Sequence, residues 1–136
     1  MGYEIKTTDC NVEITKENFK LALELINSLG VVDWAVYVDT KGLSDANALV
    51  TEFQAIRYSM SISHDQKGKP SRVILEYFTG EYLGEEAKIW STLSPAVTPG
   101  GFINWVGEEG TAWRYEFDGE KMLEKSGVTI WEGDDG

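Results

Sequence analysis

Apolar residues recur at the spacing of an α-helix in two segments of the chain. In residues 15–30 they form a stripe of Phe19, Ala22, Leu23, Ile26 and Leu29. In residues 45–56 they form a second stripe of Ala46, Leu49, Val50, Phe53 and Ile56. Thr15 and Ser44 stand where a hydroxyl can accept from the first-turn amides, and Gly30 can end the first helix. The pattern predicts two amphipathic helices over these residues.

Residues that favour strands surround these two helices. The sequence predicts strands at 11–14, 31–38, 57–63, 72–78 and 102–106, and in 57–63 the alternation puts Tyr58, Met60 and Ile62 on one face. A third, short helix with Ile89, Trp90 and Leu93 as its buried stripe ends at Pro95. The chain closes with a three-strand meander, for which 128–131 is the candidate last edge strand.

This order of elements predicts an α+β fold. Strands gather toward the C-terminus with hairpin-length connections, which favours an antiparallel sheet of about five to six strands with three helices packed mainly on one face. The chain has 136 residues and no linker or repeat. We therefore expect a single domain spanning residues 1–136.

The segment 107–121 holds aromatic residues, an arginine and several carboxylates. If 107–110 is a hairpin loop, Val106 pairs with Thr111. The core face then holds Trp113, Tyr115 and Phe117 together with Phe102 and Asn104. The outer face holds Ile103, Trp105 and Arg114, and the guanidinium of Arg114 can lie on the indole of Trp105.

The dipeptide Asp118-Gly119 predicts a type I′ turn, which sets Glu116 opposite Lys121. Most residues of the segment 107–121 therefore have a structural role. Trp105 with Arg114, and the loop doublet Glu108-Glu109, remain as interaction candidates.

Charge is the strongest signal in the composition, because 23 acids against 12 bases give a net charge of −11. The excess is greater in residues 72–136 (13 acids, 5 bases) than in residues 1–71 (10 acids, 7 bases). Such a chain repels nucleic acids and anionic membranes, so the expected partner is a basic protein. We expect the acids of the C-terminal half to form one continuous field, although a net negative charge also serves solubility alone.

Several kinds of chemistry lack the residues they need. The one histidine, His64, lies in a polar loop, and the one cysteine, Cys10, forms no intramolecular disulfide. No Cys/His spacing matches a zinc site, and no segment matches a calcium loop. We expect no catalytic residue, no metal site, no cofactor, no membrane span and no signal peptide, and a cytoplasmic protein.

Three segments of the C-terminal half resemble a diffuse family of small acidic hypothetical proteins of bacteria, phages and mobile elements. They are EYFTGEYLGEE (76–86), LSPAVTPGGFINWVGEEGTAWRYEF (93–117) and DGEKMLEKSGVTIWE (118–132). The family pattern ends in a G-E-[DE]-G-x-x-W-R-[WY]-x-F hairpin, which falls here on residues 107–117. Ahead of the hairpin, Ser94 stands where the family usually has alanine and Gly101 where it has serine. The resemblance implies a phage or mobile-element origin and brings no catalytic residues.

The leading hypothesis is a non-enzymatic inhibitor of a basic, nucleic-acid-handling host protein, of the anti-CRISPR kind. One alternative is a toxin-neutralising immunity protein. Another is a nucleotide binder or enzyme with a pocket between sheet and helices, near Trp90 and Trp105. The predicted partner-binding residues are Glu81, Glu85, Glu86, Trp105, Glu108, Glu109, Arg114, Asp134 and Asp135.

Overall fold

A computed structural model describes residues 4–29, 42–81 and 86–126 of the chain. Seven strands and three α-helices make up the described residues, together with short 3-10 helices at Lys16–Asn18 and Ser94–Ala96. In chain order they are β1 (Glu4–Asn11), β2 (Glu13–Thr15), α1 (Phe19–Ser28), α2 (Asp45–Ala55), β3 (Tyr58–His64), β4 (Pro70–Glu81), α3 (Glu86–Leu93), β5 (Phe102–Gly107), β6 (Ala112–Phe117) and β7 (Met122–Ser126).

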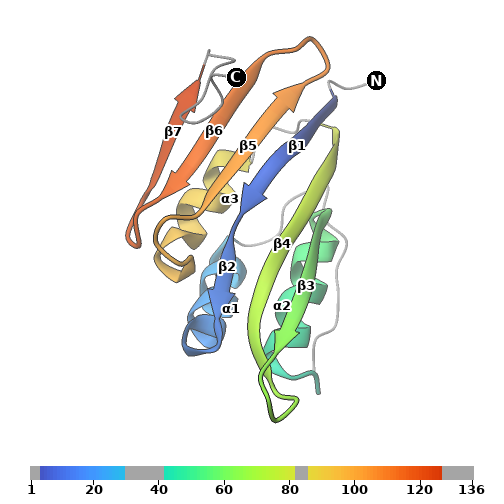
Figure 1. Cartoon of the computed structure of the whole chain (residues 1–136), viewed down its shortest axis with the longest axis vertical. Coiled ribbons are helices and arrows are strands. Elements are labelled where there is room, and N and C mark those ends of the chain that lie inside the picture. Colours follow the sequence, from blue (N-terminus) through green and yellow to red (C-terminus); the bar gives the residue numbers. More distant parts are fainter. Residues whose placement is uncertain (1–3, 30–41, 82–85, 127–136) are drawn as a thin grey trace.

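All seven strands join one antiparallel sheet, and the three helices lie behind one face of it (Figure 1). The long strand β4 has β3 on one side and both β1 and β2 on the other. From β1 the sheet continues through β5 and β6 to β7. The predicted α+β class is therefore confirmed. The structure has seven strands where about five to six were predicted. The difference arises because residues 4–15 form two consecutive strands, whereas the sequence predicted only one strand there, at 11–14.

The helix boundaries follow local chemistry. Ser44 caps α2, and its hydroxyl accepts a hydrogen bond from the backbone N–H of Asn47 at 3.3 Å, as predicted. Helix α1 begins at Phe19, later than predicted, because the 3-10 helix Lys16–Asn18 intervenes and Thr15 makes no side-chain capping bond. Gly30 and the predicted strands at 31–38 and 128–131 lie outside the described residues.

The core fills the space between the sheet and the helices with aromatic rings. Trp90 of α3 stacks on Phe53 of α2, with ring centroids 5.6 Å apart. Tyr58 of β3 meets Phe78 of β4 at 4.6 Å. Such aromatic pairs stabilise the fold by more than the burial of their apolar area alone. These contacts hold α2, α3 and the centre of the sheet together.

The register of the β5–β6 hairpin differs from the prediction by one residue. Val106 pairs with Ala112, because the loop closes with a bond from Gly107 N to Thr111 O and has Gly110 in the left-handed region at φ 89°. A one-residue shift exchanges the two faces of a strand. Trp105 therefore points into the core, 1% exposed, and stacks on Trp113 at 6.1 Å.

The prediction for the two faces of β5 is accordingly wrong. Ile103 and Trp105 belong to the core, whereas Phe102 and Asn104 lie opposite Glu116 and Arg114 on the face away from the helices. We call that face the open face.

The turn after β6 also departs from the prediction. The expected pair of Glu116 with Lys121 does not form, because Lys121 O accepts from the backbone N–H of Asp118. Gly119 and Glu120 are the central residues, and of these Gly119 has a positive φ, 96°. That pattern belongs to a type II′ turn and not to type I′.

Candidate partner-binding site

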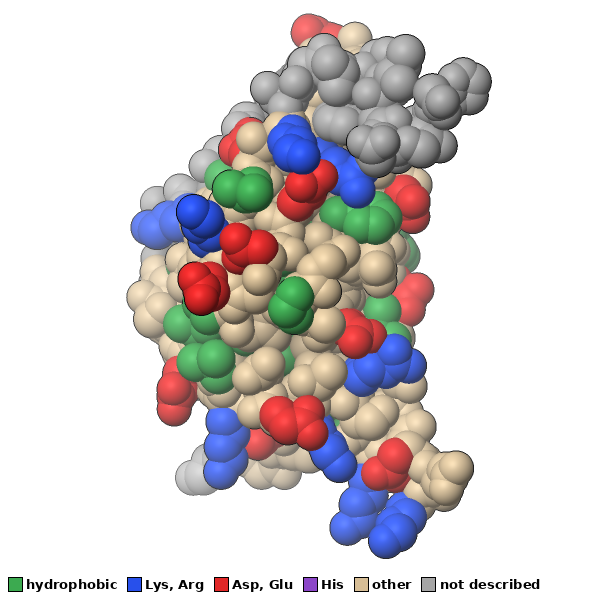
Figure 2. Space-filling view, turned by 60° about the vertical axis from the view of Figure 1, so that its left-hand side comes forward, with side chains coloured by type: hydrophobic (Ala, Val, Ile, Leu, Met, Phe, Trp, Pro, Cys, Tyr) green, Lys and Arg blue, Asp and Glu red, His purple; other side chains and the backbone are tan. Residues whose placement is uncertain are grey.

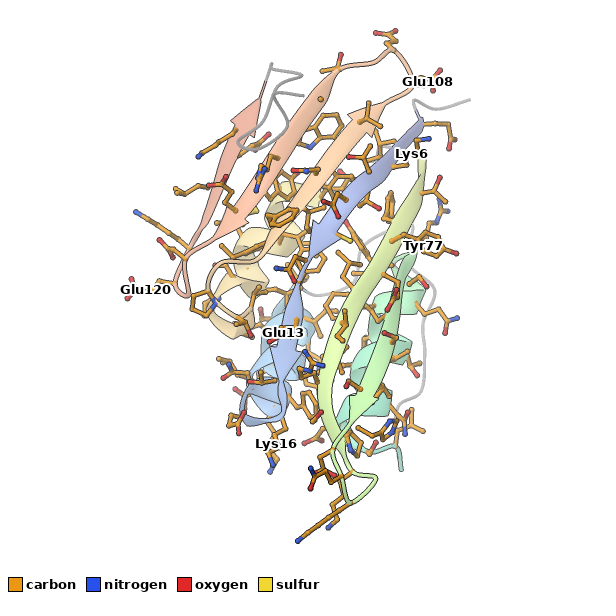
Figure 3. All side chains as sticks on the ribbon, viewed as in Figure 1. Lys6, Glu13, Lys16, Tyr77, Glu108 and Glu120 are labelled. Atoms are coloured by element: carbon orange, nitrogen blue, oxygen red, sulfur yellow. The ribbon has the colours of Figure 1, made fainter. Side chains whose placement is uncertain are left out.

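Glutamates from three distant parts of the chain meet at one end of the sheet. Glu4 begins β1 and pairs across the strands with Glu81, the last residue of β4. Glu108 lies in the β5–β6 loop, and its backbone N–H donates to Glu4 O at 2.9 Å. Glu109 is the next residue of that exposed loop. We call Glu4, Glu108 and Glu109 the acidic end, beside which the backbone of β4 finishes at Glu81 (Figure 3 labels Glu108).

Strand direction produces this meeting. Strand β1 starts at this end of the sheet, the antiparallel strand β4 finishes there, and the β5–β6 loop turns there (Figure 1). One contact also fixes a carboxylate, because the Glu4 backbone N–H donates to Glu108 Oε1 at 2.5 Å. The Glu108 side chain is thus held in place before any partner arrives.

The acidic end is unfavourable for the stability of the sheet itself. Like charges held close together repel one another, and Glu4, Glu108 and Glu109 are exposed glutamates on adjoining segments. Lys6 is the nearest base along β1, and no salt bridge joins it to Glu4, Glu108 or Glu109. The arrangement therefore leaves anionic charge facing solvent at a local cost.

A shallow hollow of about 220 Å³ lies beside these glutamates. Ile5 pairs with Gly80 on one side and with Gly107 on the other, and its own side chain is buried in the core. On the open face, the row of Gly80, Ile5 and Gly107 therefore presents only backbone atoms. The hollow is lined by Glu4, Ile5, Lys6, Thr79, Val106, Gly107 and Glu108.

Two of the predicted site residues lie in the core. Glu86 is 3% exposed in the first turn of α3, so its predicted place on a partner-binding surface is wrong. Trp105 is buried as described above, so its expected position on the outer face is also wrong. Neither side chain contacts a partner at the surface in this conformation.

Arg114 lies on the open face as predicted, but with other neighbours. Its guanidinium lies over the ring of Phe102, 4.4 Å from the centroid, and not over Trp105. Its Nε is 3.1 Å from Oε2 of Glu116, and the other carboxylate oxygen of Glu116, Oε1, is 3.0 Å from Lys125 Nζ. This side chain is therefore part of a cross-strand ion-pair network. Glu85, Asp134 and Asp135 lie outside the described residues.

The remaining described acids do not extend the acidic end into one field. Figure 2 shows acidic and basic side chains interspersed over the visible face. Glu13 pairs with Arg72 at 2.8 Å, and Glu120 lies at the β6–β7 turn, far from Glu108 (Figure 3). For the described residues, the expectation of one continuous field over the C-terminal half is wrong.

The two candidate nucleophile or base side chains have unreactive settings. Burial, with smaller contributions from Asp9 and Glu76, raises the pKa of the Cys10 thiol to about 11, so it is protonated at neutral pH. His64 is exposed at the end of β3. Among the residues that the structure describes, no three His, Cys, Asp or Glu side chains are grouped to hold a metal ion.

Sequence reasoning missed Glu4 and Lys6, because it began the first strand at residue 11. The signal was present, since Glu4-Ile5-Lys6 alternates polar and apolar residues as a half-buried strand does.

A comparison with protein-family models, with curated proteins and with solved structures finds no match. The resemblance of the C-terminal half to small acidic proteins of phages and mobile elements therefore stays a prediction. Within the described residues, no helix has the length and apolar character needed to cross a membrane.

Proposed function

We propose that this chain is a non-enzymatic interaction protein whose acidic end binds a basic protein and blocks it. The observation that carries the proposal is the gathering of the exposed residues Glu4, Glu108 and Glu109 at the end of the sheet where β4 also finishes, although like charges repel one another there. Charge kept at such a cost is typical of a binding surface.

Competition with phosphate is the proposed mechanism of inhibition. A protein that handles nucleic acid carries a groove of Lys and Arg side chains for the phosphates. Carboxylates of the acidic end occupy the same groove, and the net charge of −11 accelerates the encounter. Because the backbone N–H of Glu4 already holds the Glu108 side chain, that side chain loses less conformational entropy when the complex forms.

The proposed partner is a nucleic-acid-handling host defence protein, which makes the chain an inhibitor of the anti-CRISPR kind. A toxin-neutralising immunity protein would use the same surface chemistry on a basic toxin. The alternative of a small-molecule pocket near Trp90 and Trp105 has less support, because aromatic rings fill that space and the two side chains are 0% and 1% exposed.

The test is a capture experiment from host lysate at low and at high salt. Three forms of the full chain serve as bait: the native chain, Glu108→Gln with Glu109→Gln, and the control Glu120→Gln with Glu124→Gln. Both pairs remove two exposed charges, but Glu120 lies at the β6–β7 turn and Glu124 in the edge strand β7, away from the acidic end. Glutamine at 108 keeps an oxygen to accept from Glu4 N–H.

The proposal predicts that the native chain and the control retain a basic, nucleic-acid-binding protein at low salt, and that the first variant retains much less. High salt releases it, because exposed charge pairs are screened. Retention of no such protein, or equal retention by all three baits, contradicts the proposal.

A further inference from the structure

The hollow beside the acidic end carries opposite charges on its two sides. Glu4 and Lys6 are both exposed and stand two residues apart on β1, so their side chains share the open face. A strand rises by about 3.3 Å per residue, which places the two Cα atoms about 6–7 Å apart. Both residues line the hollow, and Glu108 lines it as well. The hollow therefore has carboxylates on the side of Glu4 and an ammonium group on the side of Lys6 (Figure 3 labels Lys6 and Glu108).

The carboxylates of the hollow do not neutralise the ammonium group of Lys6. The register neighbours of Lys6 are Thr79 on β4 and Val106 on β5, and neither is charged. The carboxylate of Glu108 is held on the other side of the hollow, because the backbone N–H of Glu4 donates to its Oε1. No salt bridge joins Lys6 to Glu4 or to Glu108. The cation and the anions of the hollow are therefore both available to a ligand.

The surface between the two charges suits the stem of a long side chain. An arginine or lysine side chain has an apolar stem and a charged head. The stem can lie over the backbone of Ile5 and Gly107, beside the Val106 side chain, while the head meets the carboxylates. A ligand that carries only positive charge also faces the ammonium group of Lys6, which repels it. A ligand with a carboxylate beside its base turns that repulsion into attraction.

We propose that the hollow recognises a pair of opposite charges on the partner. A basic side chain is bound by Glu4 and Glu108, and a carboxylate two residues further along an extended segment is bound by Lys6. This inference rests on the proposed function, because it names the chemistry that the acidic end recognises. Complementary charges give selectivity more than affinity, and a repulsive contact rejects the wrong partner. Lys6 is thus the residue that selects among basic proteins.

Two capped tripeptides test the hollow without an identified partner. When extended, acetyl-Arg-Ala-Glu-amide presents a base and an acid on one face, whereas acetyl-Arg-Ala-Gln-amide presents the base alone. Net charge favours the second peptide, because it is positive and the chain carries −11. Binding is measured from the NMR shifts of the backbone N–H groups of Lys6, Val106 and Gly107. At about 0.15 M ionic strength, exposed charges more than about 8 Å apart are largely screened.

The expected result is that the peptide with glutamate binds about 1.4-fold to 5-fold more tightly, which is the effect of one exposed ion pair. Lys6→Gln removes this preference. The control Lys121→Gln removes the same charge from another exposed lysine, away from the hollow, and keeps the preference. The proposal is overturned by equal or reversed affinities in the native chain, by a preference that survives in Lys6→Gln, or by no shift at the hollow with either peptide.

The result is separable from that of the capture experiment. A preference for the peptide with glutamate, together with no basic protein captured from lysate, refutes the inhibitor proposal and keeps the hollow as a binding site. Capture of a basic protein that depends on Glu108 and Glu109, without the peptide preference, refutes the role of Lys6 and keeps the proposed function.

Discussion

Replacing Trp105 by alanine tests the observed register of the β5–β6 hairpin. The side chain is 1% exposed and packs against the rings of Tyr58, Phe78, Trp113 and Tyr115 at centroid distances of 5.4–6.3 Å. Burying an aromatic side chain removes about 150–250 Å² from water, which at about 25 cal/mol per Å² corresponds to about 4–6 kcal/mol. Measured losses for such truncations are about 3–5 kcal/mol. We predict a loss of about 4 kcal/mol.

The assay is urea unfolding followed by far-UV circular dichroism, because tryptophan fluorescence changes with the substitution itself. With a slope of about 1–3 kcal/mol per M, the midpoint falls by about 1–4 M while the slope stays constant. Leu123→Ala is the control on the open face, where the side chain is 44% exposed and the expected loss is within about 0.5 kcal/mol. A Trp105→Ala loss as small as that of the control refutes the buried position of Trp105.

Three further predictions concern a cap, a turn and the thiol. Ser44→Ala removes the α2 cap and lowers the unfolding free energy by about 1 kcal/mol in the same assay, whereas no change means that the cap is not formed. Gly119→Ala and Gly110→Ala both place alanine at positive φ, so each lowers the free energy of unfolding by about 1–2 kcal/mol. The loss is larger for Gly119→Ala, because its Cβ would lie 2.9 Å from Pro99, and equal losses contradict this contact. Below pH 9, alkylation of Cys10 is about 100-fold slower than alkylation of a thiol of pKa 9.0, and its rate rises with pH up to about 11. A rate that reaches its plateau near pH 9 contradicts the raised pKa.

Local patterns were sufficient to predict the helices and the β3–β4 hairpin. The apolar stripes of α1, α2 and α3 have one interpretation, and the alternation of Tyr58, Met60 and Ile62 is unambiguous because serines occupy the other face of β3. Ser44 is a capping residue directly before an apolar stripe, so its role follows from its position.

The register of β5 and β6 did not follow from the sequence, because apolar residues occupy both faces of β5. Phe102 and Val106 stand on one face and Ile103 and Trp105 on the other, so either register buries a hydrophobic set. The number of residues in the loop decided between them, and the left-handed Gly110 selects a loop of Glu108, Glu109 and Gly110.

The acidic end was predicted in part. Glu81, Glu108 and Glu109 were expected at a binding surface, but their proximity to one another depends on the strand order, which brings β1 between β4 and β5. Glu86 was expected in the same group, because a glutamate in the first turn of a helix is normally exposed. Its burial depends on tertiary packing, which no local pattern reports.

The most direct test of the central claim is the affinity of the captured basic partner for three forms of the chain at fixed low salt. Two exposed ion pairs are worth about 0.4–2 kcal/mol together, so removing the charges of Glu108 and Glu109 raises the Kd about 2-fold to 30-fold. The predicted result is a rise of this size for Glu108→Gln with Glu109→Gln, and an almost unchanged Kd for Glu120→Gln with Glu124→Gln. Equal Kd values for the two variants would contradict a binding site at the acidic end.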